Sequence, residues 1–197
     1  MSGRLGAPRV EAQQFESLYE TSTDPWGYLT SEYERQKYAD TLAALPSRPI
    51  GRALEVGCSI GVFTAELALR CERLVAIDFA SRALSLARER VGHLANAQLL
   101  QASFPEQVPP GPWDVIVCSE VLYYLDEQML REAICWLRTQ LQSGSSLVAV
   151  SWRGHGSREP MRGDAAHDLL VAELGAWHVL DGRREGYRLD RFDGDGA

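Results

Sequence analysis

ALEVGCSIG, residues 53–61, is the most informative segment of the chain. An apolar run enters a turn bracketed by Gly57 and Gly61, and a helical pattern follows, so we expect a strand, a tight turn and a helix. Such glycines let the backbone approach a ligand closely, and the N–H groups at the helix start face it. A second predicted strand ends in Asp78, whose carboxylate suits a ribose diol. The segment therefore predicts a site for a nucleoside-containing cofactor.

The pattern continues along the chain as alternating strands and helices. Short apolar or β-branched runs predict five strands, at residues 52–56, 73–78, 97–101, 114–118 and 146–152. Helical spacing predicts helices at 61–71, 127–141 and 164–174, and a further helix that begins at Ser81. Ser81 and Asp126 are the predicted N-caps of their helices, and Gly175 is the predicted C-terminal glycine of the last helix. Two final strands, 177–180 and 186–192, leave no room for a helix and predict an antiparallel hairpin. We expect an α/β, Rossmann-like mixed sheet of seven strands, five parallel plus the C-terminal hairpin, flanked by helices.

The segment before residue 46 has a different character. Residues 10–20 have a helical pattern, and a loop over 21–29 contains Asp24-Pro25-Trp26. Ser31 and Glu34 form a capping box that opens a second helix, predicted to reach Leu45. We expect residues 1–45 to form a helical lid on a cofactor-binding unit at 46–197, within a single structural domain.

Composition excludes several classes of protein. The 197 residues carry 20 Lys and Arg against 27 Asp and Glu, a net charge of −7, which disfavours nucleic acid and anionic membranes as partners. No apolar run reaches the roughly 20 residues of a membrane helix, and residues 1–14 do not resemble a secretory signal. The four cysteines are scattered without a C-x-x-C pair, so we expect reduced thiols in a cytoplasmic protein and no metal site.

The spacing of the turn distinguishes between nucleoside cofactors. A dinucleotide site has the pattern G-x-G-x-x-G, but here the pattern is Glu55-x-Gly57-x-Ser59-x-Gly61, without the middle glycine. A carboxylate at residue 55 repels a pyrophosphate and attracts an ammonium. The turn thus favours S-adenosylmethionine, which becomes S-adenosylhomocysteine on losing its methyl group, over NAD.

Several segments resemble a known family. LEVGCSIG (54–61), AID (76–78) and DVIVCSEVLYYL (114–125) are similar to the class I S-adenosylmethionine-dependent methyltransferases. DPW (24–26) and SEYERQK (31–37) narrow the resemblance to the nodulation-type (NodS-like) N-methyltransferases, which act on the amino sugar of chitin oligosaccharides, and their small-molecule relatives. The resemblance runs from about Phe15 to about Leu141. It implies a small-molecule acceptor and does not indicate an oligomeric state.

The resemblance also implies a set of cofactor-binding residues. Asp78 holds the ribose, Phe79 lies against the adenine, and Ser103 stands where many relatives have an acid for the adenine amino group. Trp26 either stacks on the cofactor or fills the core, while Tyr33 and Arg35 either reach the cofactor carboxylate or lie on a solvated helix face. The full expected set is Trp26, Tyr33, Arg35, Glu55, Gly57, Cys58, Gly61, Asp78, Phe79, Ser103 and Ser119.

Residues at the carboxyl ends of the later strands are the candidates for chemistry. Glu120 follows the fourth strand, and either faces the site or is a surface acid. His155, after the fifth strand, and His167, on the helix after it, are candidate bases for an acceptor proton, or else surface or capping histidines. Tyr124 is a candidate substrate contact. The loop over 152–158 either gates the substrate or is a solvated connector.

The expected reaction is methyl transfer to a nitrogen of a small polar acceptor, such as an amino sugar or a chitooligosaccharide-like glycoside. Sulfonium is a good leaving group, so alignment supplies most of the catalysis, and proximity alone is sufficient for a neutral amine. Two alternatives remain at this point: an O-methyltransferase that tailors a natural product or sugar, and a non-catalytic cofactor-binding module.

Overall fold

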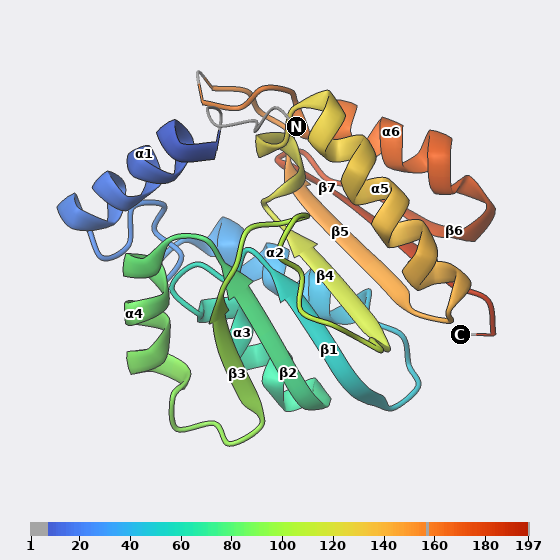
Figure 1. Cartoon of the computed structure of the whole chain (residues 1–197), viewed down its shortest axis with the longest axis horizontal. Coiled ribbons are helices and arrows are strands. Elements are labelled where there is room, and N and C mark those ends of the chain that lie inside the picture. The colour runs from blue at the N-terminus through green and yellow to red at the C-terminus, as the bar shows by residue number, and fades with distance from the viewer. Residues whose placement is uncertain (1–7, 157, 197) are drawn as a thin grey trace, which may run out of the picture.

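The computed structural model describes residues 8–156 and 158–196. Strands and helices alternate along most of this length (Figure 1). The strands are β1 (Ile50–Val56), β2 (Cys71–Asp78), β3 (Ala97–Gln101), β4 (Val115–Ser119), β5 (Ser146–Trp152), β6 (His178–Arg183) and β7 (Tyr187–Asp193). The helices are α1 (Pro8–Thr21), α2 (Glu32–Ala43), α3 (Val62–Leu67), α4 (Ser81–Val91), α5 (Glu127–Gln142) and α6 (Gly163–Leu174), with 3₁₀ turns η1 (Ala68–Arg70), η2 (Leu122–Tyr124) and η3 (Gly175–Trp177).

The strands form one seven-stranded sheet in the order β3-β2-β1-β4-β5-β7-β6. The pairs among β1 to β5 are parallel, whereas β7 is antiparallel to both β5 and β6. Strands β1 to β3 are added toward one edge of the sheet, and β4 and β5 are added on the other side of β1. The boundary between β1 and β4 is therefore the switch point at which open α/β sheets bind ligands. The predicted fold, including the terminal hairpin, is confirmed.

Two apolar layers cover the faces of the sheet. Alternate residues of each central strand point to opposite faces, as the period of two requires. Leu54, Ile116 and their neighbours pack with α5 and α6, while Ala53 and Val117 pack with residues of α2, α3 and α4. The central strands are therefore buried on both sides and rigid enough to fix the loops at their carboxyl ends.

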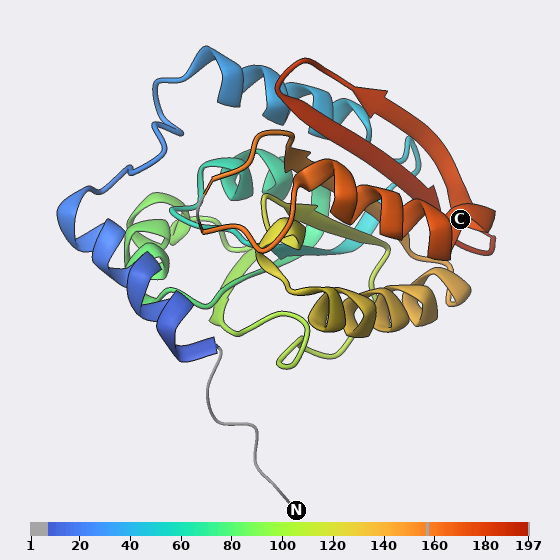
Figure 2. The same ribbon diagram turned by 90° about the horizontal axis from the view of Figure 1, so that it is seen from above.

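Of the two N-terminal helices, α1 lies outside these layers, whereas α2 contributes Tyr38 to one of them. In both views α1 lies beside α4 (Figures 1 and 2). Helix α2 lies behind the sheet in Figure 1, and its Tyr33 and Asp40 side chains are hydrogen-bonded to the β6–β7 hairpin. Ser31 caps α2 by accepting the Glu34 N–H at 3.3 Å, as predicted, but Glu34 does not reach back to complete the box. Residues 1–7, the start of the expected lid, lie outside the described residues.

Some predicted helix ends are wrong. Ser81 is the first residue of α4 and not its cap; the cap is Ala80, and the Glu16 carboxylate of α1 accepts the Ser81 and Arg82 N–H groups instead. Gly175 has right-handed φ of −59°, so it continues into η3 and is not a left-handed terminator. Asp126 does cap α5, through the Met129 N–H at 2.8 Å.

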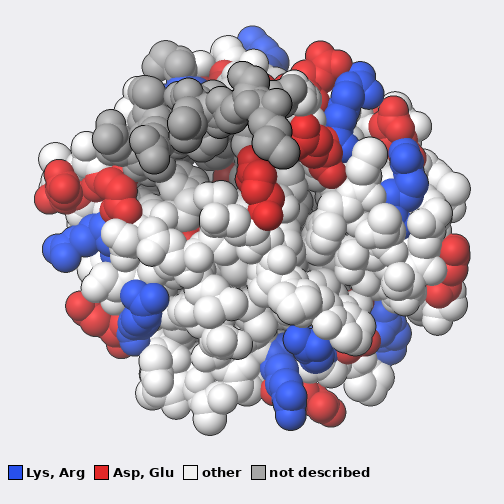
Figure 3. All heavy atoms as spheres, in the orientation of Figure 1, with Lys and Arg blue, Asp and Glu red and all other residues white. Residues whose placement is uncertain are grey.

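Charge and thiols complete the description of the fold. On the face in Figure 3, acidic and basic side chains are interspersed around the rim, with no block of one sign. No described helix has the length and apolarity to cross a membrane. Cys58, Cys71, Cys118 and Cys135 are free thiols, and the described residues contain no cluster of three or more metal-ligating side chains.

Candidate active site

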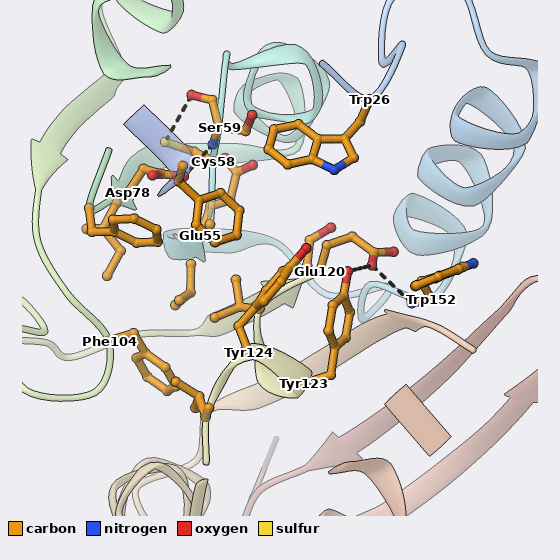
Figure 4. Close-up of a pocket in the computed structure, with 18 of the residues that line it drawn as sticks. Trp26, Glu55, Cys58, Ser59, Asp78, Phe104, Glu120, Tyr123, Tyr124 and Trp152 are labelled. Carbon is orange, nitrogen blue, oxygen red and sulfur yellow. Dashed lines mark hydrogen bonds between the residues drawn. The ribbon is translucent and has the colours of Figure 1, made fainter. Parts of the chain in front are cut away.

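A large cavity opens at the carboxyl ends of the central strands, with a volume of about 1430 Å³. Figure 4 shows it lined from the turn after β1, the end of β2, the loop after β4 and the N-terminal segment. Of the predicted site residues, those that line it are Trp26, Tyr33, Glu55, Gly57, Cys58, Asp78, Phe79, Ser103, Ser119, Glu120 and Tyr124. The sequence thus predicted much of the wall, from residues that are up to 98 positions apart.

The turn after β1 has the close backbone geometry that its glycines predict. Gly57 has a φ of +83°, and a Cβ there would meet the side chain of Val121 and lie 3.0 Å from the Ser119 carbonyl oxygen. Ser59 is also left-handed, with a φ of 49°, a conformation that costs a non-glycine residue roughly 1–2 kcal/mol. Its N–H donates to the Asp78 carboxylate at 2.8 Å, which fixes the turn.

Gly61 differs from the prediction. It does not line the cavity. Its φ is +78°, and a Cβ placed on Gly61 would lie only 3.1 Å from the Cβ of Ala87. The absence of a side chain therefore lets the start of α3 pack against α4. We therefore assign Gly61 to the packing that supports the turn.

Two buried carboxyl groups stand on either side of this turn. Glu55 is 1% exposed, and its Oε2 has no hydrogen-bond partner. Burial raises the pKa of Glu55 to about 8 and that of Asp78 to about 6. Asp78 accepts the N–H groups of Ser59 and Ala80, one on each oxygen, which leaves further lone pairs for a donor in the cavity. A buried carboxyl group with one unpartnered oxygen fits an ammonium, and Asp78 fits a diol.

Aromatic side chains from the N-terminal segment form the opposite wall. Phe15 of α1 packs on Phe79 and Tyr124, with ring centroids 5.3 and 5.0 Å apart, and stacks on Trp26 at 5.9 Å. Tyr19 shares a 2.5 Å hydrogen bond with Ser59. Trp26 therefore lines the cavity and also belongs to an aromatic cluster, so both interpretations made from the sequence describe part of its surroundings.

Glu120 lies in the cavity at the end of β4 in a left-handed conformation, with a φ of 58°. Its Oε2 accepts the Tyr123 hydroxyl at 2.5 Å and the Trp152 N–H at 3.0 Å (Figure 4). Its Oε1 accepts the Lys37 ammonium at 2.7 Å. Lys37 also donates to Glu34 at 3.1 Å. Glu120 is thus a cavity carboxylate held by three donors and not a surface acid.

Sequence reasoning assigned no role to Lys37, although the sequence carries a signal. Lys37 is the only lysine in a chain with 20 Lys and Arg residues. Every other basic position of the chain is an arginine. The single departure indicates a site that needs a compact point charge.

Other predicted residues lie elsewhere. Arg35 is exposed, donates to Glu32 and to the Thr30 carbonyl, and does not line the cavity. Tyr33 lines the cavity, but its hydroxyl donates to the Gly186 carbonyl at 3.1 Å. Ser103 lines the cavity near Phe79, and its N–H donates to Gln107. The geometry therefore gives no support to Arg35 as a ligand of the cofactor carboxylate.

The two histidines proposed as bases are not brought to the site. His155 is exposed and absent from the cavity wall, and the adjoining loop includes Ser157, which lies outside the described residues. His167 is fully buried under α6, where its Nδ1 is 2.6 Å from Asp190 of β7. We therefore correct the assignment of His167: its ring serves a structural cluster, because the helix face that carries it turns toward the sheet and away from the cavity.

Comparison with known proteins places this site in a family. A family model described as Nodulation protein S (NodS) matches residues 11–173. The chain belongs to the NodS family. The nodulation protein S of Rhizobium tropici is 37% identical over 132 residues, which make up 66% of this chain but only 56% of the length of that relative.

Solved structures show the same fold. The N-methyltransferase NodS from Bradyrhizobium japonicum WM9, in complex with S-adenosyl-L-homocysteine, is 25% identical with a TM-score of 0.77, over 93% of this chain and 98% of that one. A Pseudomonas syringae protein assigned as a methyltransferase is 35% identical with a TM-score of 0.72, over 83% of this chain and 99% of that one. This NodS-family chain thus shares its fold with a protein that was crystallised in complex with S-adenosyl-L-homocysteine.

Proposed function

We propose that this NodS-family chain is an S-adenosylmethionine-dependent N-methyltransferase. The observation that carries the proposal is the pair of buried carboxyl groups around the Gly57 turn: Glu55 has an unpartnered oxygen for the cofactor ammonium, and Asp78 has free lone pairs for the ribose diol. Phe79 and Ser103 line the adjoining wall, where the adenine belongs. The NodS structure in complex with S-adenosylhomocysteine supports the same choice of cofactor.

The charge of the cavity supports an amine as the acceptor. Its described wall contains eight acids, namely Glu34, Glu55, Asp78, Glu106, Glu120, Asp126, Glu132 and Glu159, but only two basic residues, Lys37 and Arg158. Lys37 is already bonded to two carboxylates. Such a wall attracts a cation and repels a phosphate or carboxylate. Aromatic rings among these acids suit a polyol amine, so we propose an amino sugar or a chitooligosaccharide-like glycoside.

The chain's own groups then have defined tasks. The cofactor supplies a methyl group on a positively charged sulfur. Glu120 takes a proton from the acceptor ammonium, so that the nitrogen lone pair forms the new N–C bond while the C–S bond electrons remain on sulfur. Tyr123 and Tyr124 orient the acceptor beside Ser119. Alignment supplies the larger share of the rate, up to roughly 7–11 kcal/mol of the barrier for well-oriented groups.

We also propose that residues 1–45 act as a lid on the unit at 46–197. Phe15, Tyr19 and Trp26 cover the cavity from α1 and the following loop. The lid keeps water from the reacting groups, which strengthens the interactions of the charges inside.

Release of S-adenosylhomocysteine in the presence of an acceptor panel tests the function. We expect turnover with glucosamine and deacetylated chitooligosaccharides, and none with their N-acetylated counterparts, because an amide nitrogen has no available lone pair. Phosphoethanolamine serves as the anionic control and is expected to be a poor acceptor. Turnover with hydroxyl groups of the N-acetylated sugars would contradict N-methylation and favour an O-methyltransferase.

A further inference from the structure

We propose that Lys37 is a positioning residue, whose ammonium holds the Glu120 carboxylate fixed in direction at the acceptor end of the cavity. The catalytic meaning of this role rests on the proposed function. Its geometry rests on contacts between α2 and the end of β4, which are 83 residues apart in the chain.

The Lys37 ammonium is enclosed and shared among carboxylates. The residue is 1% exposed, and its Nζ lies 2.7 Å from Glu120 Oε1 and 2.9 Å from Glu34 Oε2. Tyr33 and Tyr38 place their rings 5.2 and 5.9 Å from the same nitrogen. The three charged groups sum to one negative charge, so the unit attracts an acceptor cation while Lys37 keeps the two carboxylates from repelling each other.

The enclosed site between Glu34 and Glu120 suits the side chain of a lysine. A lysine has a compact charge with three donors, whereas the planar guanidinium of arginine requires more room and a fixed fork. The chain uses arginine at all its other basic positions. Burial favours a lower pKa for Lys37, but Glu120 and Glu34 outweigh burial and raise the pKa above its usual value. Lys37 therefore stays protonated and is not itself the base.

Glu120 is the group that this charge fixes. Its left-handed backbone is a conformation that glutamate rarely adopts, and three donors hold its carboxylate. Titratable and charged groups face the pair from every packed element: Tyr28 before α2; Tyr33, Glu34 and Tyr38 on α2; and Tyr123 and Tyr124 on η2. Of these groups and Lys37, only Lys37 carries a positive charge, so its removal leaves Glu120 beside neutral phenols and another acid.

Because the chain contains one lysine, the pair can be observed without any enzyme assay. Full-length protein labelled with ¹³C and ¹⁵N in lysine gives a single side-chain signal by NMR. In Glu120→Gln we expect the midpoint of Lys37 titration to fall by about one pH unit or more, because the larger of the two raising charges is lost. An unchanged midpoint would overturn the proposed pair even if Lys37→Met does not fold.

Kinetics of Lys37→Met test the consequence for the reaction. The acid limb of the kcat/KM profile is expected to move to higher pH, because the variant removes the positive charge that lies 2.7 Å from Glu120 Oε1. The affinity for S-adenosylhomocysteine, measured by calorimetry, is expected to stay within about twofold, because the cofactor groups bind elsewhere. Asp40→Asn, on the same helix, breaks contacts to Arg184 and Tyr187 and is the control for a loosened α2.

The outcomes separate the proposals. A moved limb in Lys37→Met with an unmoved limb in Asp40→Asn supports the positioning role. A Lys37→Met profile that only decreases in amplitude, as in Asp40→Asn, shows a structural role and overturns it. Wild-type protein that binds no S-adenosylhomocysteine contradicts the proposed function, and with it the catalytic role of the pair, whatever the NMR titration gives.

Discussion

Glu55 shows how a single side chain connects burial to the proposed function. It is enclosed, its Oε2 lacks a partner, and burial raises its pKa to about 8.

The spacing to Gly57 predicted Glu55 as a site residue, and the position of Asp78 at a strand end predicted Asp78, because both predictions depend on local strand and turn geometry. Lys37 escaped prediction, since its meaning arises from Glu120 on a distant strand. His167 was misplaced because sequence spacing does not tell which helix face meets the sheet.

The raised pKa of Glu55 predicts proton release on cofactor binding. At pH 7 the empty protein holds Glu55 largely protonated, and an arriving ammonium favours the carboxylate, so a proton is released. We expect the binding enthalpy of S-adenosylhomocysteine to vary linearly with the ionisation enthalpy of the buffer. The slope is expected to correspond to the release of most of one proton per cofactor bound. Glu55→Gln is the matched control and should show a reduced dependence. Equal buffer dependence in both proteins would contradict this role.

The same group predicts how stability without ligand depends on pH. The pKa of Glu55 is about 8 in the folded protein, against an ordinary value of 4.5, so the native state binds the proton more tightly than the unfolded state does. This contribution is complete below about pH 4.5 and is lost as pH rises through 8. Relative to Glu55→Gln, we expect wild-type unfolding free energy to fall by on the order of 3 kcal/mol from pH 5 to 8. Urea denaturation measures it, and parallel pH profiles would exclude it.

At the scale of elements, a carboxylate of α1 caps the start of α4. Ala80 provides no side-chain cap for α4, and Glu16 accepts the Ser81 and Arg82 N–H groups at 2.6 and 3.1 Å. The capped start of α5 was predictable because Asp126 is adjacent to its helix, whereas this cap comes from 65 residues away. The buried face of α2, which includes Glu34, Lys37 and Thr41, is polar and escapes a search for apolar periodicity.

Removing that carboxylate is expected to loosen the lid. Glu16→Ala should lower stability by about 1 kcal/mol, the usual value of a helix cap. It should also speed proteolysis within α1 and weaken S-adenosylhomocysteine binding, since Phe15 and Tyr19 are carried by the same helix. Glu20→Ala, at an exposed position of α1, is the control. Identical cleavage rates for the two variants would argue against a docking role for Glu16.

At the scale of the whole molecule, a buried charge cluster joins the terminal hairpin to α6. Asp190 of β7 is fully buried and accepts His167 at 2.6 Å and His178 at 2.8 Å, and Arg188 lies 2.8 Å away. The hairpin itself was predictable from chain length between strands. This cluster was not, because it depends on side-chain direction in three elements.

Asp190→Asn is expected to be strongly destabilising. Burial favours a higher pKa, but hydrogen bonds from His167 and His178 and the charge of Arg188 outweigh it and lower the pKa of Asp190. Its contribution is thus present above about pH 4 and lost on acidification. Leaving Arg188 without this partner should cost roughly 3–5 kcal/mol at neutral pH. A loss below 1 kcal/mol in urea denaturation at pH 7 would refute this estimate.

Calorimetric titration of the full-length protein with S-adenosylhomocysteine, beside Asp78→Asn and with NAD as the rival ligand, tests the central claim most directly. Wild-type protein is expected to bind the thioether and not NAD, and Asp78→Asn to bind at least about tenfold more weakly, because a charged hydrogen-bond acceptor for the ribose is lost. No binding of S-adenosylhomocysteine, or equal binding by wild type and Asp78→Asn, would contradict the account.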